Sequence, residues 1–267
     1  MEIACSLAGP CRSAGAFSNG RILDCGNAVL KIELHAHTSD DPLDLIPYDS
    51  RELIARAAEH GYQALAITLH DRQLDLSELT PFARERGITL IPGIERTIEG
   101  KHVLLINFSA GGAERVRSFD DLRRLRRQES GLVIAPHPFF PLNTCLQSLA
   151  LRHRDLFDAV EINGMFTAAL DFNQKAMRWA RAAGLPIVGN GDVHRFDQLN
   201  TTWSLVEAEP TPHSICRAIR EGRVQVEARP HSVLTAAAIM TDMFMADLRQ
   251  GVAALVRPRT ARSVFDR

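Results

Sequence analysis

The stretch VLKIELHAHTSDDP, residues 29–42, places two histidines and two aspartates where a short apolar run ends in a loop. The apolar run reads as a β-strand. In a strand, residues i and i+2 point to the same side, so His35 and His37 can bind one metal ion together. Asp40 and Asp41 follow in a loop that can fold back and add a ligand. Taken alone, the histidine pair is a weak signal, because strand histidines also satisfy hydrogen bonds in a core.

The chain beyond this stretch alternates between helical and apolar segments. A helix is expected over residues 49–61, where Asp49 and Glu52 can form a capping box and Gly61 ends the helix. Further short apolar runs read as strands at residues 64–68, 88–95, 102–108, 132–136, 159–163 and 185–190. Nearly continuous apolar strands separated by helices indicate a parallel sheet covered on both faces. About seven such units in about 200 residues predict an α/β barrel similar to a TIM barrel.

Three segments are expected along the chain. Residues 1–28 are rich in Ser, Gly and Ala and are predicted to be a loosely ordered extension. Residues 29–230 form the catalytic domain, and residues 231–267 hold a packing helix and a tail. The five cysteines form no C-x-x-C pair, which is typical of reduced thiols in a cytoplasmic protein. No apolar run is long enough to span a membrane, and no secretory signal is recognised.

Charge limits the expected partners. The formal net charge is −1 and the isoelectric point is about 6.8. Without an overall basic field, the chain gives no strong nucleic-acid signal, and phosphate recognition is expected to be local. The oligomeric state is left open.

Histidines and carboxylates recur at the ends of the predicted strands. His70, His137 and His194 follow strands, whereas His102 begins one; Glu95 and Asp192 lie at or just beyond strand ends, as the printed sequence shows. In a parallel barrel the carboxyl ends of the strands converge on one mouth, where barrel enzymes carry out their chemistry. Several imidazoles with few carboxylates are typical of a transition-metal site, which suits Zn, Mn or Fe better than Mg or Ca.

These segments resemble, in this order, the PHP family, named for polymerase and histidinol phosphatase domains. The matching stretches are ELHAHTSDDP, AITLHD, IPGIE, KHVLLINF, APHPFF, DAVEIN and GNGDVHRFDQLNTTWSLVE. They run from about residue 32 to 207, and TPHSICRAIREGRV extends the similarity to about residue 224. The resemblance implies a single PHP domain folded as a distorted (β/α)7 barrel. It also implies hydrolysis of phosphate esters, and hence a small phosphorylated substrate as the partner, with two or three divalent metal ions (Zn, Mn or Fe).

The resemblance also implies ligand sets, matched position by position. The first metal would be held by His35, His37, Glu95 and Asp192. Glu95 would bridge to a second metal, held also by His102 and His137. The third would be held by His70, His194 and Asp40. The first loop is shorter here than the family pattern, so Asp41 remains an alternative to Asp40. Leu69 stands where many members have Asp, and GNGDVH replaces the common GSDAH.

The nucleophile is expected to be a metal-bound water, since the sequence contains no nucleophile elbow or P-loop. The general acid is left open. Arg195, Arg96 and Asn163 are the candidates for substrate binding, because a guanidinium can grip phosphate in a bidentate way. Either arginine could equally pair with a nearby carboxylate. Histidinol phosphate, nucleotides and nucleoside bisphosphates all remain possible substrates.

Two alternatives stay open. A metal-dependent amidohydrolase is also a barrel with an H-x-H motif on its first strand. It usually needs a bridging lysine at a middle strand end, and the three lysines, Lys31, Lys101 and Lys175, do not end such a strand. A non-catalytic, metal-stabilised module is the second alternative, and the full set of ligand-type residues disfavours it.

Overall fold

The computed structural model describes residues 28–241. Its nine strands are β1 (Val29–Glu33), β2 (Ala64–Ile67), β3 (Thr89–Ile98), β4 (Lys101–Ile106), β5 (Leu132–Ala135), β6 (Ala159–Asn163), β7 (Ile187–Asn190), β8 (Thr202–Glu207) and β9 (Val224–Ala228). Its helices are α1 (Ser50–Glu59), α2 (Leu79–Arg84), α3 (Ala110–Ala113), α4 (Phe119–Gln128), α5 (Ser148–Arg152), the 3-10 turn η1 (Arg154–Leu156), α6 (Asn173–Ala183) and α7 (Pro212–Arg220).

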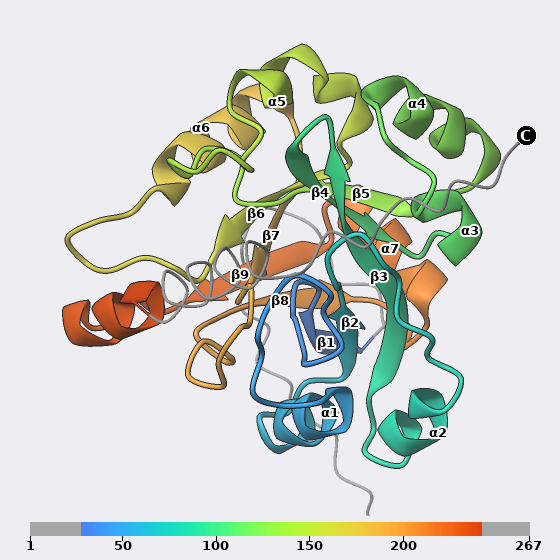
Figure 1. Cartoon of the computed structure of the whole chain (residues 1–267), viewed down its shortest axis with the longest axis vertical. Helices are drawn as coiled ribbons and strands as arrows, with labels where there is room; N and C mark the ends of the chain where they lie inside the picture. Colours follow the sequence, from blue (N-terminus) through green and yellow to red (C-terminus); the bar gives the residue numbers. More distant parts are fainter. Residues whose placement is uncertain (1–27, 242–267) are drawn as a thin grey trace, which may run out of the picture.

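The nine strands form one sheet in the order β7-β6-β5-β4-β3-β2-β1-β8-β9, which curls into a nearly closed barrel with helices around it (Figure 1). The predicted α/β barrel is confirmed. Strand β7 returns to lie beside β8 and β9. The Ser204 hydroxyl joins β8 to β7 by donating to the Gly189 carbonyl at 3.0 Å and accepting from the Gly189 amide at 2.9 Å. A Cβ on Gly189 would lie 2.4 Å from Val226 Cγ1, so this approach requires glycine.

The sheet is mixed, and the expectation of an all-parallel sheet is wrong at two places. Strand β4 runs antiparallel to both β3 and β5, and β8 runs antiparallel to β1 and β9. The physical reason at β4 is the two-residue turn Glu99–Gly100, in which both residues have positive φ (49° and 76°), as tight hairpins require. Because β4 runs antiparallel to β3 and β5, its first residues lie at the same mouth as the last residues of those two strands.

Local sequence signals set the helix starts. In α1, Asp49 and Glu52 form the predicted capping box, and Ser118 with Asp121 form a second one at α4. Thr211 caps α7. These caps satisfy backbone N–H groups that would otherwise lack partners at the helix ends.

Three apolar clusters hold the fold together. One packs α1 and α2 against β2 and β3, and a second packs α4 and α6 against the strands from β3 to β6. The third joins side chains of β1, β2, β4 and β5 to one face of α7, with Ile215 and Ile219 fully buried. Figure 1 shows α1 and α2 on one side of the barrel and α4, α5 and α6 on the other. The strand ends are therefore held rigidly while their loops remain at the mouth.

The predicted extension 1–28 lies almost wholly outside the described residues, and so does the expected tail from residue 242. Residues 233–241 are helical. Cys145 and Cys216 are both free and buried. Over residues 28–241, no helix combines the length and the apolar character needed to cross a membrane.

Candidate metal centre

Two short motifs from opposite ends of the described chain interlock at the barrel mouth. Ala36 and Val193 form an isolated parallel bridge, in which His37 N donates to Val193 O at 3.0 Å and Val193 N donates to His35 O at 3.1 Å. Ala36 and Val193 are buried in the apolar cluster below α1 and α2. Since side chains alternate along an extended chain, their neighbours face the other way. The bridge therefore brings together His35, His37, Asp192 and His194.

Glu95 lies at the centre of the histidines. An isolated bridge between His70 and Glu95 aligns β3 with the segment after β2. One carboxylate oxygen of Glu95, Oε2, lies 3.2 Å from His35 Nε2, 3.3 Å from His37 Nε2 and 3.1 Å from His70 Nε2. The other oxygen, Oε1, lies 2.7 Å from His102 Nδ1 and 3.4 Å from His137 Nε2. The two oxygens thus face two different groups of imidazoles, as a bridging carboxylate does.

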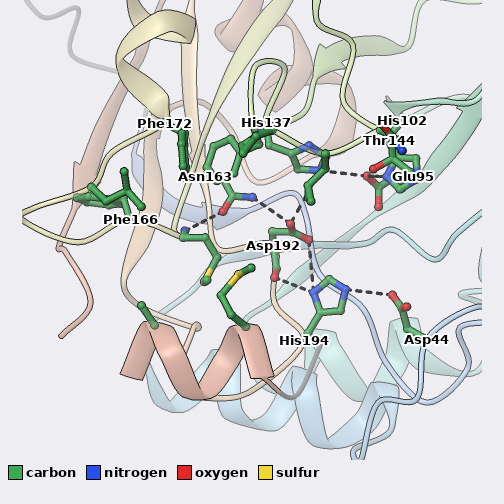
Figure 2. Close-up of a pocket in the computed structure, with 18 of the residues that line it drawn as sticks. Asp44, Glu95, His102, His137, Thr144, Asn163, Phe166, Phe172, Asp192 and His194 are labelled. Atoms are coloured by element: carbon green, nitrogen blue, oxygen red, sulfur yellow. Dashed lines mark hydrogen bonds and ion pairs between the residues drawn. The ribbon is translucent and has the colours of Figure 1, made fainter. Parts of the chain in front are cut away.

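Asp192 and His194 complete the mouth on the side of β7. Asp192 Oδ1 lies 3.2 Å from His35 Nε2 and 3.5 Å from His37 Nε2, while His194 Nε2 lies 3.0 Å from Asp44 Oδ2. Figure 2 shows Asp192 between His137 and His194, with Asp44 on the far side of the His194 ring. Asp192 is thus the second carboxylate that contacts the H-x-H pair.

The first loop requires a correction. The expected ligand Asp40 lies apart from the imidazoles, and its carboxylate accepts hydrogen bonds from Thr38 and from Ser50 at 2.7 Å. Asp41 Oδ2 instead lies 2.9 Å from His37 Nδ1 and 3.1 Å from His70 Nδ1, so the geometry favours the alternative. Asp44, which sequence reasoning did not select, lies 3.3 Å from His70. The loop folds back at Asp41, whose backbone and carboxylate close the turn, and Asp40 therefore faces α1.

Glu161 was also missed. It is fully buried, and its carboxylate accepts from His35 Nδ1 at 2.9 Å, from the His137 amide at 3.1 Å and from Asn190 Nδ2 at 2.8 Å. A carboxylate that contacts the remote nitrogen of a ligating histidine fixes its ring and its tautomer. The available signal was the single acidic residue within the otherwise apolar strand at residues 159–163.

Two residues at the mouth adopt unusual backbone conformations. His137 has φ of 27° and Asp192 has φ of 51°, in the left-handed region that favours glycine. Such conformations persist only where the surrounding structure imposes them, and they concentrate at functional sites. The strain supports a role for both side chains beyond packing.

In the cluster, buried carboxylates lie next to imidazoles, and each shifts the pKa of the other. Burial would raise the pKa of the Glu95 carboxyl, but the His102, His35 and His70 rings hold that pKa well below its usual range. Burial would lower the pKa of His70, yet Glu95 and Asp41 raise it to about 9. The pKa of Asp192 is likewise held low, against burial, by the nearby histidines. Without a metal, the His70 imidazole therefore retains a proton that a bound cation would replace.

Two independent observations indicate that these residues fit metal ions. Among the described residues, His35 Nε2, His37 Nε2 and Glu95 Oε1 are buried without a well-formed hydrogen bond. The ligand atoms of a tetrahedral ion lie about 3.4 Å apart if each is about 2.1 Å from the metal. The 3.2–3.5 Å separations among His35, His37, Glu95 and Asp192 match that spacing. Groups of His, Asp and Glu that could hold an ion are therefore present.

The three candidate substrate-binding residues have different positions. Arg96 is buried, donating to the Val116 carbonyl and pairing with Asp71, so it lies away from the mouth. Arg195 pairs with Asp197 at 3.1 Å. Both arginines therefore contact carboxylates. Asn163 does line the mouth and donates to Asp192 Oδ2 at 3.0 Å.

A pocket of about 480 Å³ opens directly on the cluster. Its lining includes the site residues His70, Glu95, His102, His137, Asp192 and His194. In Figure 2, Glu95 and His102 lie at one side of the pocket and Phe166 and Phe172 at the other, with Asp192 and His137 between them. A bound molecule would thus contact the candidate ligands and a separate wall at the same time.

Comparisons of the sequence with known proteins give a match to a family model and a local similarity to a curated protein. Residues 171–224 match the family model described as PHP-associated. The DNA polymerase III PolC-type of Caldanaerobacter subterraneus subsp. tengcongensis is 42% identical over 65 residues, which cover 24% of this chain and 5% of the polymerase. The chain thus spans only a small part of the length of this curated relative.

Solved structures share the fold. A two-domain Bacteroides vulgatus protein containing a predicted PHP-like metal-dependent phosphoesterase superimposes with a TM-score of 0.60 and 21% identity, over 81% of this chain and 70% of that one. The lesion-specific endonuclease PfuEndoQ of Pyrococcus furiosus gives a TM-score of 0.52 and 15% identity, over 74% of this chain and 58% of the endonuclease.

One expectation about partners is overturned. An Endonuclease Q with the same fold has been solved in complex with a 27-mer duplex substrate, and the curated relative described above is a DNA polymerase III PolC-type. The absence of a nucleic-acid signal, inferred from net charge, is therefore wrong. Net charge reports a summed field, whereas phosphate contacts at a metal site act locally and leave little trace in it.

The family match, the PolC-type similarity and the shared fold together confirm the resemblance to the PHP family that the sequence motifs predicted, and the chain folds as a PHP-like barrel.

Proposed function

We propose that this chain is a metal-dependent hydrolase of phosphate esters, acting as a phosphatase or a small phosphodiesterase. The observation that carries the proposal is the central position of Glu95, whose two oxygens face two separate groups of imidazoles. A carboxylate in this position can hold two cations at the short separation that in-line displacement at phosphorus uses. The similarity to PHP-like phosphoesterases supports the same reaction class.

The proposed ligands follow the contacts. The first ion would be held by His35, His37, Glu95 and Asp192, and the second by Glu95, His102 and His137. A third would be held by His70 and His194 together with Asp41 or Asp44, in place of Asp40. We propose two or three divalent ions of Zn, Mn or Fe, since imidazole-rich sites prefer these metals. When bound, the ions would supply an activated water and positive charge for the phosphoryl oxygens.

Glu161 and Asn163 position two of the proposed metal ligands. Glu161 holds the His35 ring through Nδ1, so that Nε2 is directed at the cluster. Asn163 donates to Asp192 and keeps that carboxylate oriented toward the histidines.

The amidohydrolase alternative lacks its lysine. Lys31 donates to the His60 carbonyl and contacts Asn200, Lys101 contacts the Asn143 carbonyl, and Lys175 lies over the Phe139 ring. These are all the lysines of the chain, and each is committed to a contact outside the clustered histidines and carboxylates.

The test combines metal analysis with activity. Protein purified without chelator would be analysed for bound metals and assayed for phosphate release from sugar phosphates, nucleotides and histidinol phosphate. Cleavage of a short oligonucleotide, an amide and a lactone would be measured in parallel. Phosphate-ester turnover that chelator abolishes and Mn or Zn restores is expected. Turnover of the amide or lactone alone would establish the amidohydrolase, and no turnover of any compound by loaded protein would establish a non-catalytic module.

A further inference from the structure

The pocket beside the candidate ligands has an apolar wall that the proposed chemistry does not need. The wall consists of Phe140, Leu142, Met165, Phe166, Leu170 and Phe172, with Ala236 and Met240 from the helical residues 233–241. Phe140 and Phe172 lie with ring centroids 5.4 Å apart and planes tilted by 55°. Such a pair presents a ring face and a ring edge to a third flat group. The wall is thus shaped for an apolar or aromatic part of a ligand.

The wall begins next to the cluster. The Phe140 ring centroid lies 6.2 Å from that of His137, which itself contacts Glu95. An apolar group joined to a phosphate by a short linker would therefore reach Phe140 while the phosphate remained at the ligands. The wall also continues outward, because Leu142, Leu170 and Met240 are each about half exposed at 49%, 56% and 52%. Three of the large apolar side chains that the described surface exposes thus gather at this one mouth.

The charges of the pocket restrict the ligand further. Over residues 28–241, the pocket lining contains neither lysine nor arginine. The two arginines nearest to the ligands in sequence contact carboxylates, Arg96 with Asp71 and Arg195 with Asp197. A second phosphate or a carboxylate placed against the wall would lose its hydration without gaining a cation, which is costly. An ammonium group in the same place would meet aromatic and aliphatic carbon instead of a carboxylate.

We propose that the ligand of this pocket is an ester with a single phosphate group, whose alcohol part carries a neutral aromatic or bulky apolar group. The phosphate would lie at the ligands and the apolar group against Phe140 and Phe172. An aryl group and an uncharged nucleobase both satisfy this chemistry. Sugar phosphates, bisphosphates and amino-alcohol phosphates do not. The hydrolysis reaction in this inference rests on the proposed function, whereas the substrate selectivity rests on the apolar wall.

The experiment compares esters that share the same reacting bond. The metal-loaded full chain would be assayed with ethyl phosphate, 2-phenylethyl phosphate and 2-aminoethyl phosphate, whose leaving groups are all primary alcohols. A nucleoside 5′-monophosphate would be added to distinguish a nucleobase from a simple aryl group. Burial of a phenyl ring is expected to raise kcat/KM for 2-phenylethyl phosphate about 10- to 100-fold over ethyl phosphate. The aminoethyl ester should fall at or below ethyl phosphate.

Variants locate the effect on the wall. Phe140→Ala and Phe172→Ala should each remove most of the preference, through KM, while turnover of ethyl phosphate and the metal content stay unchanged. Phe82→Ala is the matched control, because Phe82 lies on α2 against Arg86, away from the pocket. It should retain the full preference. Circular dichroism and metal analysis of each variant show whether it folds as the parent does.

The outcomes separate the two proposals. If ethyl phosphate is turned over and the phenylethyl ester is no better, the inference is overturned and the proposed function stands. If no ester is turned over, the proposed function fails, and calorimetry with 2-phenylethylphosphonate and ethylphosphonate decides the inference. A Kd about tenfold lower for the phenylethyl compound, lost in Phe140→Ala, supports an apolar-ligand pocket; equal Kd values overturn it.

Discussion

The pocket has two walls: the cluster of imidazoles and carboxylates, called the rigid wall below, and the apolar wall. They differ in how tightly their side chains are held. On one wall, each imidazole contacts at least one carboxylate within about 3.4 Å, and isolated backbone bridges at Ala36 and Glu95 fix the positions. On the other wall, Phe140, Leu142 and Leu170 come from loops and are half-exposed or exposed. In the proposed function, the rigid wall would set the reaction, whereas the apolar wall would set the choice of substrate and could change without disturbing the reaction.

The largest effect is expected from removing a ligand on the rigid wall. His37→Ala deletes a side chain that contacts Glu95, Asp192 and Asp41, so it should lower kcat/KM for phosphate esters by about 1,000-fold or more. Metal analysis should show loss of bound ion. His213→Ala, an exposed histidine of α7, should leave both quantities unchanged. Parental activity in His37→Ala would contradict the metal centre.

A smaller effect is expected one contact further from the proposed ions. Glu161→Gln leaves the shape of the side chain but replaces one of the two carboxylate oxygens with an NH₂ donor. Of these two oxygens, Oε2 accepts from His35 and Asn190 and Oε1 accepts from the His137 amide. Metal affinity and activity should each fall about 10- to 100-fold. The measurement is competitive metal titration with a chelating dye, and Glu227→Gln, exposed on β9, is the control. An unchanged metal Kd would assign Glu161 to structure alone.

Two aspartates of the first loop, Asp44 and Asp40, can be compared directly as candidate ligands. Asp44→Asn weakens a contact with His70 and His194, so activity should fall about tenfold. Asp40→Asn changes only hydrogen bonds to Thr38 and Ser50 and should have little effect on rate. Steady-state kinetics with both variants checks this. The reverse order would restore Asp40 as the ligand.

The metal-free protein should lose stability as pH rises. The folded-state pKa of His70 is raised from 6.5 to about 9, so its contribution is complete below pH 6.5 and is lost as pH passes through 9. The raised pKa of buried Glu33, about 8, acts in the same direction between its usual value of 4.5 and 8. The Tm of chelator-treated protein should fall by about 5 °C between pH 6.5 and 9. Metal-loaded protein should show a smaller fall, since bound ions replace the proton of His70 whereas Glu33, which is not a proposed ligand, still titrates.

The smallest effect belongs to the apolar wall. Leu170→Ser removes an apolar side chain that is 56% exposed at the mouth, so KM for an aryl phosphate should rise about two- to fivefold with kcat unchanged. Metal content should equal that of the parent. Initial-rate kinetics measures the change, and an altered kcat would show that the two walls are coupled.

Much of the rigid wall could be predicted from the sequence, and little of the apolar wall. His35, His37, Glu95 and Asp192 follow from strand periodicity and motif order, because those signals are local. Asp44 and Glu161 could not be predicted in the same way, since their roles depend on how a loop folds back and on which strand neighbours β1 across the barrel. The antiparallel β4 was missed because a strand's apolar pattern does not encode its direction, although Gly100 marked the turn.

The apolar wall depends on still longer-range placement. Phe140 and Phe172 lie in different loops, and their approach follows from the order of β5, β6 and α6 in space. Arg96 was selected for its position beside Glu95 in sequence. Adjacent residues of a strand face opposite sides, however, so the same position carries it away from the mouth and toward Asp71.

The bridge between Ala36 and Val193 has a consequence for how the site comes into being. Its two halves are synthesised early and late, so the first part of the chain emerging from a ribosome has the H-x-H pair but not Asp192 and His194. With the proposed ligand set, high-affinity binding of a metal ion would then require that β7 has docked and the barrel has closed. The time course of metal binding would therefore report barrel closure, and rapid mixing of unfolded chain with a metal-sensitive dye would measure it.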